Sequence, residues 1–242
     1  MSTSFVHLVI PAYNEGGRLP AYLPRLCEAL ADKSCPPWRI TVVDDGSHAD
    51  DAQAMKKCAE SCGSRVTYQK LAVNSGKGAA VYTGWDSDHS SEWLGLLDAD
   101  GSIPPSEVLR LLRSLDESRV PDALFGSRCK ILGHTVERSW IRHVCGRLFA
   151  TVVCLATGIP VYDSQCGFKL VRRRCYEAVR PSLREKRFAF DVELLVNLRK
   201  SGAQIVEVPI DWSDIPGTKV HFFRDTTQML VAILGMKMRN SN

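Results

Sequence analysis

Short apolar runs rich in β-branched residues alternate with stretches of helical periodicity along the first half of the chain. The apolar runs predict strands at Phe5–Ile10, Arg39–Val43, Val66–Lys70 and Trp93–Leu97, and the stretches between them predict helices. Strands that alternate with helices at short spacing are typical of a mostly parallel sheet covered on both faces. The expected fold class is therefore α/β, with a twisted, mostly parallel sheet flanked by helices.

The second half of the chain is less regular. Glu137–Thr157 predicts a long helix with basic residues near its start, Asp163–Lys169 is rich in turn residues, and Asp225–Arg239 predicts a closing helix. No low-complexity linker and no internal repeat interrupt the 242 residues. We therefore expect a single domain over residues 1–242, in which residues 1–127 form one half and residues 128–242 a C-terminal elaboration.

Positive charge is concentrated late in the chain. The net charge of +4 is too mild to indicate nucleic-acid binding, but eight lysines and arginines lie between Lys169 and Arg187, against two glutamates. Such a segment serves an anionic substrate, an anionic membrane surface or simply a solvated face. Its composition alone leaves the three interpretations open.

The cysteines and the apolar segments bear on the compartment. The nine cysteines are odd in number and form no C-x-x-C pair, which favours a reduced, cytoplasmic protein over a disulfide framework or a zinc site. Neither a signal peptide nor a run of eighteen apolar residues is recognised, so we expect no membrane span. Ser139–Thr157 and Thr226–Arg239 combine an apolar face with basic residues, which predicts reversible, peripheral association with the cytosolic face of a membrane. Helices packed on a core produce the same pattern and are the alternative.

Asp98 and Asp100 directly follow the predicted strand Trp93–Leu97. Residues two apart in an extended segment point the same way, so the two carboxylates converge on one point. Two close carboxylates repel each other unless a cation lies between them, and hard oxygen ligands favour Mg²⁺ or Mn²⁺. A calcium loop is excluded because the glycine stands at position four rather than six and position twelve is Leu109. The pair predicts a metal site, with an acidic surface turn as the alternative.

Two further segments lie where α/β folds bind ligands. Asp44 and Asp45 end the second predicted strand, where a carboxylate can accept hydrogen bonds from a nucleobase or a ribose. Asn74–Gly78 lacks the pattern of a Walker A loop, but a glycine-rich helix start that carries Lys77 is a reasonable anion site. An ordinary turn and a helix start without a ligand are the alternatives.

Together these segments resemble a known family. Val9–Glu15, Val42–Ser47, Asn74–Gly78 and Leu97–Asp100 are similar, in this order, to the nucleotide-sugar half of family 2 glycosyltransferases, which have the Rossmann-like GT-A fold. Segments of the second half resemble the dolichyl-phosphate β-glucosyltransferases and, more distantly, the dolichyl-phosphate mannose synthases: Gly126–Arg128, Arg138–Arg142, Asp163–Lys169, Phe188–Leu195 and Trp212–Lys219. The resemblance covers nearly the whole chain.

The resemblance implies an inverting, metal-dependent transfer of a hexose, glucose from UDP-glucose, to a polyprenyl or dolichyl phosphate. Asp98 and Asp100 are expected to hold Mg²⁺ or Mn²⁺ across the diphosphate, where the metal stabilises the charge of the leaving group, and Lys219 is a further candidate for this clamp. The donor site is expected to comprise residues that follow strands or begin a helix: Pro11, Tyr13, Glu15, Asp44, Asp45, Lys77 and Ala99.

The acceptor implied by the resemblance needs cations more than it needs a base. A phosphate monoester has a second pKa of about 6, so it already carries a nucleophilic oxygen at pH 7. Arg128, Arg138 and Arg142 are expected to bind it, because guanidinium binds phosphate through paired hydrogen bonds. A surface salt bridge is the alternative for each arginine.

Four polar residues of the second half are expected to have sugar-binding or orienting roles: Asp163, Gln165, Asp191 and Glu193. The three acids could each orient an arginine, contact a sugar hydroxyl or act as a base. We favour structural and orienting roles for Asp191 and Glu193, because residues two apart on a helix face differently.

The expected partners are a nucleotide-sugar donor, a polyprenyl-phosphate acceptor and a membrane surface, without nucleic acid; a homo-oligomer is compatible with the sequence. The alternatives are GDP-mannose as donor, a saccharide hydroxyl as acceptor, and an inactive nucleotide-binding scaffold. A nucleotidyltransferase is disfavoured because no glycine-rich loop of that type follows the first strand.

Overall fold

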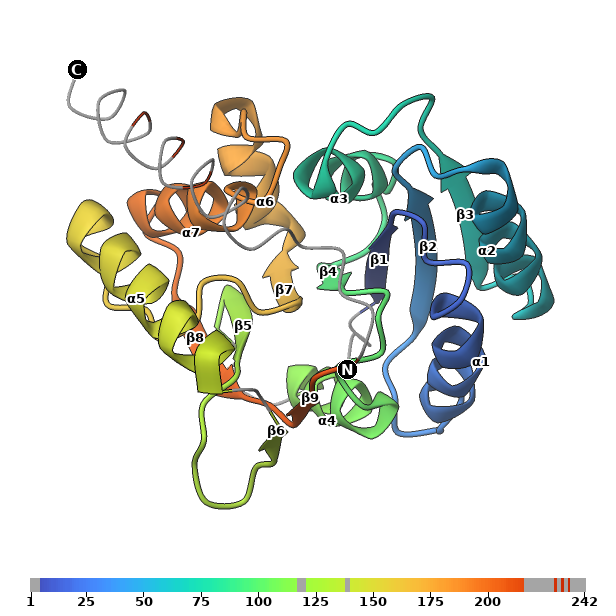
Figure 1. Cartoon of the computed structure of the whole chain (residues 1–242), viewed down its shortest axis with the longest axis horizontal. Helices are drawn as coiled ribbons and strands as arrows, with labels where there is room; N and C mark the ends of the chain where they lie inside the picture. Colours follow the sequence, from blue (N-terminus) through green and yellow to red (C-terminus); the bar gives the residue numbers. More distant parts are fainter. Residues whose placement is uncertain are drawn as a thin grey trace.

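The computed structural model of the chain describes residues 5–116, 121–137 and 140–215, together with Met229, Ala232 and Gly235. The side chains of residues 116, 140–145 and 148 lie outside that description. Figure 1 shows a central sheet with helices on both faces. Helices of the first half cover one face, and helices of both halves cover the other.

The central sheet has seven strands in the order β3-β2-β1-β4-β7-β5-β8. All of them run parallel except β7, which is antiparallel to both β4 and β5. The strands are β1 (Val6–Ala12), β2 (Trp38–Asp44), β3 (Val66–Lys70), β4 (Trp93–Leu97), β5 (Ala123–Ser127), β7 (Phe168–Arg172) and β8 (Ile205–Pro209). A second, two-stranded sheet pairs β6 (Val136–Glu137) with β9 (Trp212–Ser213).

Each face of the sheet has its own hydrophobic core. On one face lie α1 (Leu19–Leu30), α2 (Ala49–Ser61) and α4 (Pro105–Arg113), which is followed by a 3₁₀ turn at Ser114–Asp116. On the other face lie α3 (Lys77–Asp86), α6 (Arg173–Val179) and α7 (Phe190–Lys200), with a 3₁₀ turn at Arg180–Ser182. A third cluster joins α5 (Trp140–Thr157) to α7 and Met229.

The structure confirms the α/β fold class and the strands and helices predicted for the first half, within a residue or two at their ends. It corrects the second half. Asp163–Lys169 is not only a turn, because its last two residues begin β7. The long helix begins at Trp140 rather than Glu137, since Val136–Glu137 pairs with β9. Of the predicted closing helix, only Met229, Ala232 and Gly235 belong to the described residues, and these three are helical.

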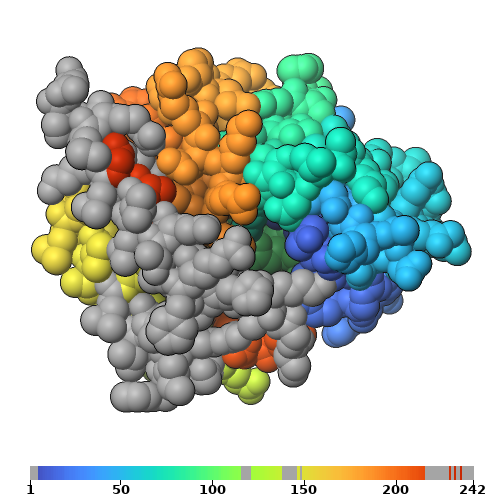
Figure 2. Space-filling model, turned by 45° about the horizontal axis from the view of Figure 1, so that its top comes forward, coloured from blue at the N-terminus to red at the C-terminus, as the bar shows by residue number. Residues whose placement is uncertain are grey.

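The topology brings three loops together at one edge of the sheet. β1 lies between β2 and β4 and runs parallel to both, so the loops that follow these strands emerge side by side. Figure 2 shows a hollow in this region, bordered by the blue first-half loops, the cyan-green segment around α3 and the orange segment around α6 and α7. Ligands of open α/β sheets bind outside the carboxyl ends of such strands.

Candidate active site

Asp98 lies at the centre of this edge, immediately after β4. Its backbone N–H donates to the carbonyl of Gly167 at 2.9 Å, and its Oδ1 lies 2.6 Å from the Nζ of Lys77. A Cβ on Gly167 would lie 2.1 Å from Oδ2 of Asp98, closer than real Cβ atoms approach. Glycine at position 167 is therefore what lets the second half of the chain pack against the carboxylate of the first.

The two acidic side chains of this loop have opposite electrostatic surroundings. Burial alone would raise the pKa of Asp98, but the charges of Lys77, Lys169 and Arg128 outweigh burial and lower it. Burial and the neighbouring charge of Asp98 raise the pKa of Asp100, and the Ser102 N–H, which donates at 2.9 Å, opposes that rise. The charge of Arg18 also opposes the rise, but among the described residues Asp100 forms no salt bridge like that of Asp98 with Lys77.

Asp98 and Asp100 suit a metal ion whose remaining ligands come from a substrate and from water. Among the described residues, no group of three or more His, Cys, Asp or Glu side chains converges as a metal cage would. Mg²⁺ characteristically binds through one or two carboxylates, with substrate phosphates and water as the remaining ligands. Asp98 and Asp100 lie at the carboxyl edge of the sheet, and their negative charges repel each other. The pair fits that mode of binding.

Asp44 and Asp45 hold the neighbouring loops in place. Asp45 accepts hydrogen bonds from the backbone N–H groups of Ser75 and Gly76, at 2.7 and 2.8 Å. Burial raises the pKa of Asp45, and these two N–H donors oppose that rise. Asp44 accepts from the N–H of Ser47 at 2.8 Å and from the hydroxyl of Tyr68. Both carboxylates are buried and make these bonds within the protein, so they hold the loops after β2 and before α3 in place.

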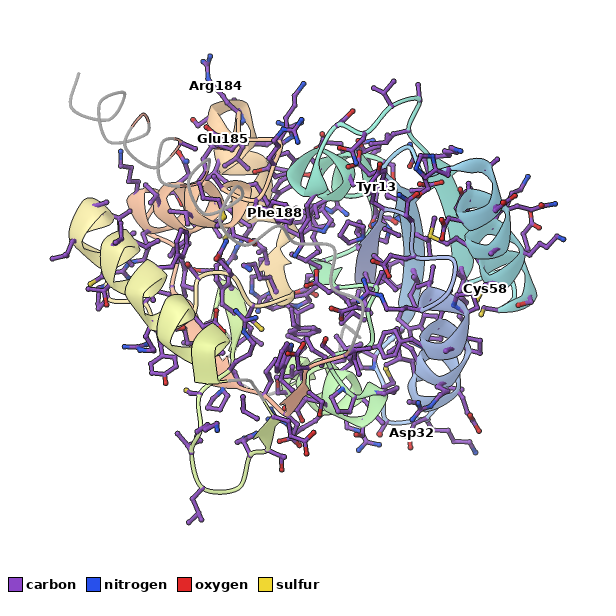
Figure 3. The ribbon with its side chains drawn as sticks, viewed as in Figure 1. Tyr13, Asp32, Cys58, Arg184, Glu185 and Phe188 are labelled. Carbon is purple, nitrogen blue, oxygen red and sulfur yellow. The ribbon has the colours of Figure 1, made fainter. Side chains whose placement is uncertain are left out.

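The loop after β1 is tied to the loop after β2 by a residue that the sequence analysis missed. Asn14 has a positive φ of 53°, its N–H donates to Oγ of Ser47 at 2.8 Å, and its Oδ1 accepts from the N–H of His48 at 3.0 Å. Asparagine tolerates the left-handed conformation better than most residues, which was the available signal. Tyr13, just before it, is partly exposed at this edge (Figure 3).

Of the other two residues predicted on the β1 loop, Glu15 is buried and is occupied by an arginine. Its carboxylate accepts from Nε of Arg18 at 2.6 Å and also pairs with a second nitrogen of the same guanidinium. Pro11 lies within β1, and Ala99 is buried between Asp98 and Asp100. The Glu15 carboxylate is therefore already engaged by Arg18.

Arg128 and Asp163 form a bidentate pair next to the acidic loop. Nε of Arg128 lies 2.6 Å from Oδ2 of Asp163, and Nη2 lies 2.8 Å from Oδ1. Burial alone would lower the pKa of Arg128, but the Asp163 carboxylate raises it, so the guanidinium stays charged. Asp163 is itself held by its backbone N–H, which donates to Glu207 at 2.8 Å. Of the three roles left open for Asp163, the geometry corresponds to orienting an arginine.

A fully buried lysine was not predicted as part of the site. Nζ of Lys169 lies 2.7 Å from Oδ1 of Asp191 and donates to the Cys166 carbonyl at 2.8 Å, beneath the ring of Phe125. Burial raises the pKa of Asp191, and the charges of Lys169 and Lys77 only partly oppose that rise. The signal in the sequence was a lysine in the otherwise apolar run after Gly167, within a segment taken for a turn.

Asp191 and Glu193 contact different partners, as expected for positions two apart on a helix. Oε2 of Glu193 accepts from the N–H groups of Arg184 and Glu185, at 2.8 and 2.7 Å. Figure 3 labels these two donor residues. Glu193 thereby holds the turn before α7, whose Lys186 carbonyl accepts from the N–H of Ala79 in α3.

The remaining predicted residues are placed only in part. The side-chain amide of Gln165 donates to the sulfur of Met229. Arg138 and Lys219 lie outside the described residues, as does the side chain of Arg142. Their roles stay predictions.

Most of the late basic residues serve the fold. Five of the eight between Lys169 and Arg187 pair with acids: Lys169 with Asp191, Arg172 with Glu92, Arg173 with Asp88, Arg174 with Asp122 and Arg180 with Asp86. The concentration of charge therefore reflects ion pairs within the chain, both surface and partly buried, more than a single anion-binding surface.

Comparison with known proteins identifies relatives of the whole chain. The family model described as "Glycosyl transferase family 2" matches residues 7–180. The dolichyl-phosphate beta-glucosyltransferase of Saccharomyces cerevisiae is 31% identical over 252 residues, covering 97% of this chain and 74% of that protein. The Homo sapiens protein of the same name is 31% identical over 247 residues, covering 98% of this chain and 76% of its own length.

Solved structures share the fold at low sequence identity. Glucosyl-3-phosphoglycerate synthase from Mycobacterium tuberculosis, in complex with Mn²⁺ and UDP-glucose, matches with a TM-score of 0.71 at 15% identity, over 97% of this chain and 79% of that chain. Mannosyl-3-phosphoglycerate synthase from Rubrobacter xylanophilus matches with a TM-score of 0.70 at 16% identity, over 98% and 74%. These matches confirm the predicted GT-A fold. Within the described part of the chain, no helix is both long and apolar enough to cross a membrane.

Proposed function

Because the chain belongs to glycosyl transferase family 2 and is a glycosyltransferase, we propose that it transfers glucose from UDP-glucose to a polyprenyl phosphate such as dolichyl phosphate, with inversion. The observation that carries the proposal is the 31% identity, over 97% and 98% of the chain, to two proteins named for glucosyl transfer to dolichyl phosphate. UDP as the nucleotide rests on the resemblance of the donor motifs to this group of enzymes.

The donor would lie along the edge formed by the loops after β1, β2 and β4. Asp98 and Asp100 would hold Mg²⁺ or Mn²⁺, which, when bound, neutralises negative charge on the leaving diphosphate. Lys77, the first residue of α3, adds a cation that favours a phosphate, whereas the nearby N–H groups of Gly76 and Ala79 already donate to Asp45 and to the Lys186 carbonyl. Asp45 keeps that helix start in place through its bonds to Ser75 and Gly76.

The acceptor phosphate would attack the anomeric carbon from the face opposite the diphosphate. A bond forms between a phosphate oxygen and that carbon while the bond from carbon to diphosphate breaks, and UDP leaves with the electron pair. The attacking oxygen of a phosphate dianion carries no proton, so no general base is required. Arg128 would attract the dianion, and its guanidinium is already fixed by Asp163, so that little reorganisation is needed.

A lipid acceptor requires access from a membrane surface. The loop between β5 and β6 projects from the body of the molecule in Figure 1 and carries Ile131 and Leu132, the latter fully exposed, beside Lys130. Exposed apolar residues next to a cation are typical of segments that lie in the headgroup region. We include this loop, with the exposed Leu155 of α5, in a peripheral membrane contact on the cytosolic face.

Transfer of radiolabel tests the proposal directly. The protein is incubated with labelled UDP-glucose and dolichyl phosphate, and label that extracts into organic solvent is counted with and without EDTA. We expect lipid-linked label that EDTA abolishes and added Mn²⁺ or Mg²⁺ restores. Asp100→Asn should abolish transfer, whereas Asp32→Asn, at an exposed aspartate that follows α1 (Figure 3), should leave it unchanged.

Other outcomes of the same assay would overturn the proposal. Label from GDP-mannose in place of UDP-glucose would contradict the donor, and label on a saccharide with none in the lipid phase would contradict the acceptor. No transfer from either donor would favour the scaffold. Transfer that persists in EDTA would contradict the metal.

A further inference from the structure

Lys77 occupies the side of Asp98 that a metal would need. Its Nζ lies 2.6 Å from Oδ1 of Asp98, and its side chain is only 16% exposed. The other carboxylate oxygen, Oδ2, packs against Gly167. A Cβ on that glycine would lie 2.1 Å from this oxygen. A cation that approaches Asp98 therefore meets an oxygen already engaged by an ammonium group.

The backbone of Lys77 is fixed, so only its side chain can yield. The preceding residue, Gly76, has a φ of 104°, and a Cβ there would lie 2.4 Å from the Lys186 carbonyl. The Gly76 N–H donates to Asp45, which anchors the start of α3 from the other side. The lysine side chain nevertheless has four methylene groups, enough to redirect its ammonium between neighbouring anions.

Lys77 has no ready second partner within the described residues. Asp191 and Asp100 contribute to its electrostatic surroundings, but Asp191 is already paired with Lys169 at 2.7 Å, and Asp100 would share the cation with Asp98. Displacing the ammonium from Asp98 would leave a largely buried charge without a counterion, which is strongly unfavourable. A diphosphate bound beside Lys77 would supply that counterion.

We propose that Lys77 couples metal binding to donor binding: it neutralises Asp98 in the empty site, and it passes to the donor diphosphate when the cation takes Asp98. This inference rests on the proposed function, since it requires a nucleoside-diphosphate donor. The metal alone then has to displace the Lys77 ammonium group without giving it another counterion. When the metal and the nucleotide bind together, the metal pairs with Asp98 and the diphosphate pairs with Lys77. Coupling of this kind is reciprocal, so each ligand raises the affinity for the other by the same factor.

The consequence is measurable without turnover. Binding of Mn²⁺ is followed by electron paramagnetic resonance with and without saturating UDP, and binding of UDP is followed by calorimetry with and without Mn²⁺. In Lys77→Met we expect Mn²⁺ alone to bind about tenfold more tightly, UDP alone to bind about tenfold more weakly, and the coupling factor to fall about tenfold or more. Lys77→Gln should behave in the same way and serves if the Met variant unfolds.

Two control variants separate this role from others. Lys77→Arg keeps the positive charge and should keep most of the coupling, and Lys56→Met, on the exposed face of α2, should change nothing. A lysine that only contacts phosphate would weaken UDP and leave Mn²⁺ alone unchanged, and a lysine that only supports the fold would weaken both ligands. Either result would overturn the inference. If the unaltered protein binds neither UDP nor Mn²⁺, the proposed function itself fails, which is a distinct result.

Discussion

The Asp163 carboxylate accepts two parallel hydrogen bonds from the guanidinium of Arg128, from Nε at 2.6 Å and from Nη2 at 2.8 Å. The aspartate precedes β7 and the arginine follows β5, so the pair joins the loops of two strands that neighbour each other in the sheet. The two charges are mostly shielded from solvent, with 17% and 9% of their side chains exposed.

Asp163→Asn should impair both stability and transfer. Loss of one partner leaves a mostly buried guanidinium without its counterion, which we expect to lower the free energy of unfolding by about 3 kcal/mol. Urea denaturation measures that change, and kcat should fall because Arg128 is no longer held. Arg128→Met combined with Asp163→Asn should be less destabilised than the sum of the single variants. Additive effects would show that the pair does not act as a unit.

Gly167→Ala should disable the metal site while the rest of the fold persists. The new Cβ would meet Oδ2 of Asp98 at 2.1 Å, so the carboxylate has to move from its place beside Lys77. Overpacking of this kind destabilises by about 1–3 kcal/mol. We expect Mn²⁺ affinity in the presence of UDP to fall at least tenfold, measured by electron paramagnetic resonance. Gly17→Ala is the matched control, because nothing lies within 4 Å of a Cβ there; equal effects of both changes would contradict the prediction.

The first half of the site could be predicted from sequence because each motif is local. Asp98 and Asp100 follow a strand directly, so a parallel sheet places them at its edge with neighbours whose motifs also follow strands. Prediction was weaker where long-range contacts decide what a side chain does. Asp45 was assigned to the nucleoside, yet its carboxylate binds Ser75 and Gly76, thirty residues away, and no local pattern encodes that contact.

The second half was harder to predict for a topological reason. β7 enters the sheet between β4 and β5 and runs against their direction, so it falls outside the regular alternation that marks parallel strands, although α6 follows it directly. Lys169 was overlooked for the same reason: a lysine in a turn is ordinarily solvated, whereas a lysine in a central strand must find an anion, here Asp191.

His7 should make stability depend on pH between neutrality and mild acid. Its Nε2 pairs with Thr41 at 2.8 Å and its Nδ1 faces Asp88 at 3.3 Å, but Asp88 already binds both Arg39 and Arg173. Burial and the charges of these two arginines lower the pKa of His7 from 6.5 to about 3. Histidine therefore stays neutral in the folded protein while it takes up a proton in the unfolded chain.

The sign of the effect follows from that difference. The unfolded state binds more protons below pH 6.5, so the free energy of unfolding should fall as the pH drops, by about 1.4 kcal/mol per unit from this group. Between pH 7 and pH 5 the His7 contribution comes to about 2 kcal/mol. His7→Asn should remove that part of the loss, as measured by urea denaturation at the two pH values. Equal losses in the variant and the unaltered protein would show that His7 is already protonated or unperturbed.

Ile131 and Leu132 should govern association with a membrane. Both side chains are exposed on the loop between β5 and β6, and that of Leu132 is fully exposed to solvent. Burying two such side chains in the headgroup region is worth about 1.5–3 kcal/mol each, so replacing both by serine should weaken binding to anionic vesicles by tenfold or more. Co-flotation with vesicles of phosphatidylserine and phosphatidylcholine measures the change in binding.

Two controls test whether the effect is specific to this loop and to access. Val206→Ser, which removes a partly exposed apolar side chain from β8, should leave flotation unchanged. Transfer to a short, water-soluble polyprenyl phosphate should be preserved in the double serine variant, because the loop residues act on access and not on chemistry. Unaltered flotation of that variant would mean that another surface makes the contact, and loss of transfer to the soluble acceptor would mean that the loop belongs to the active site.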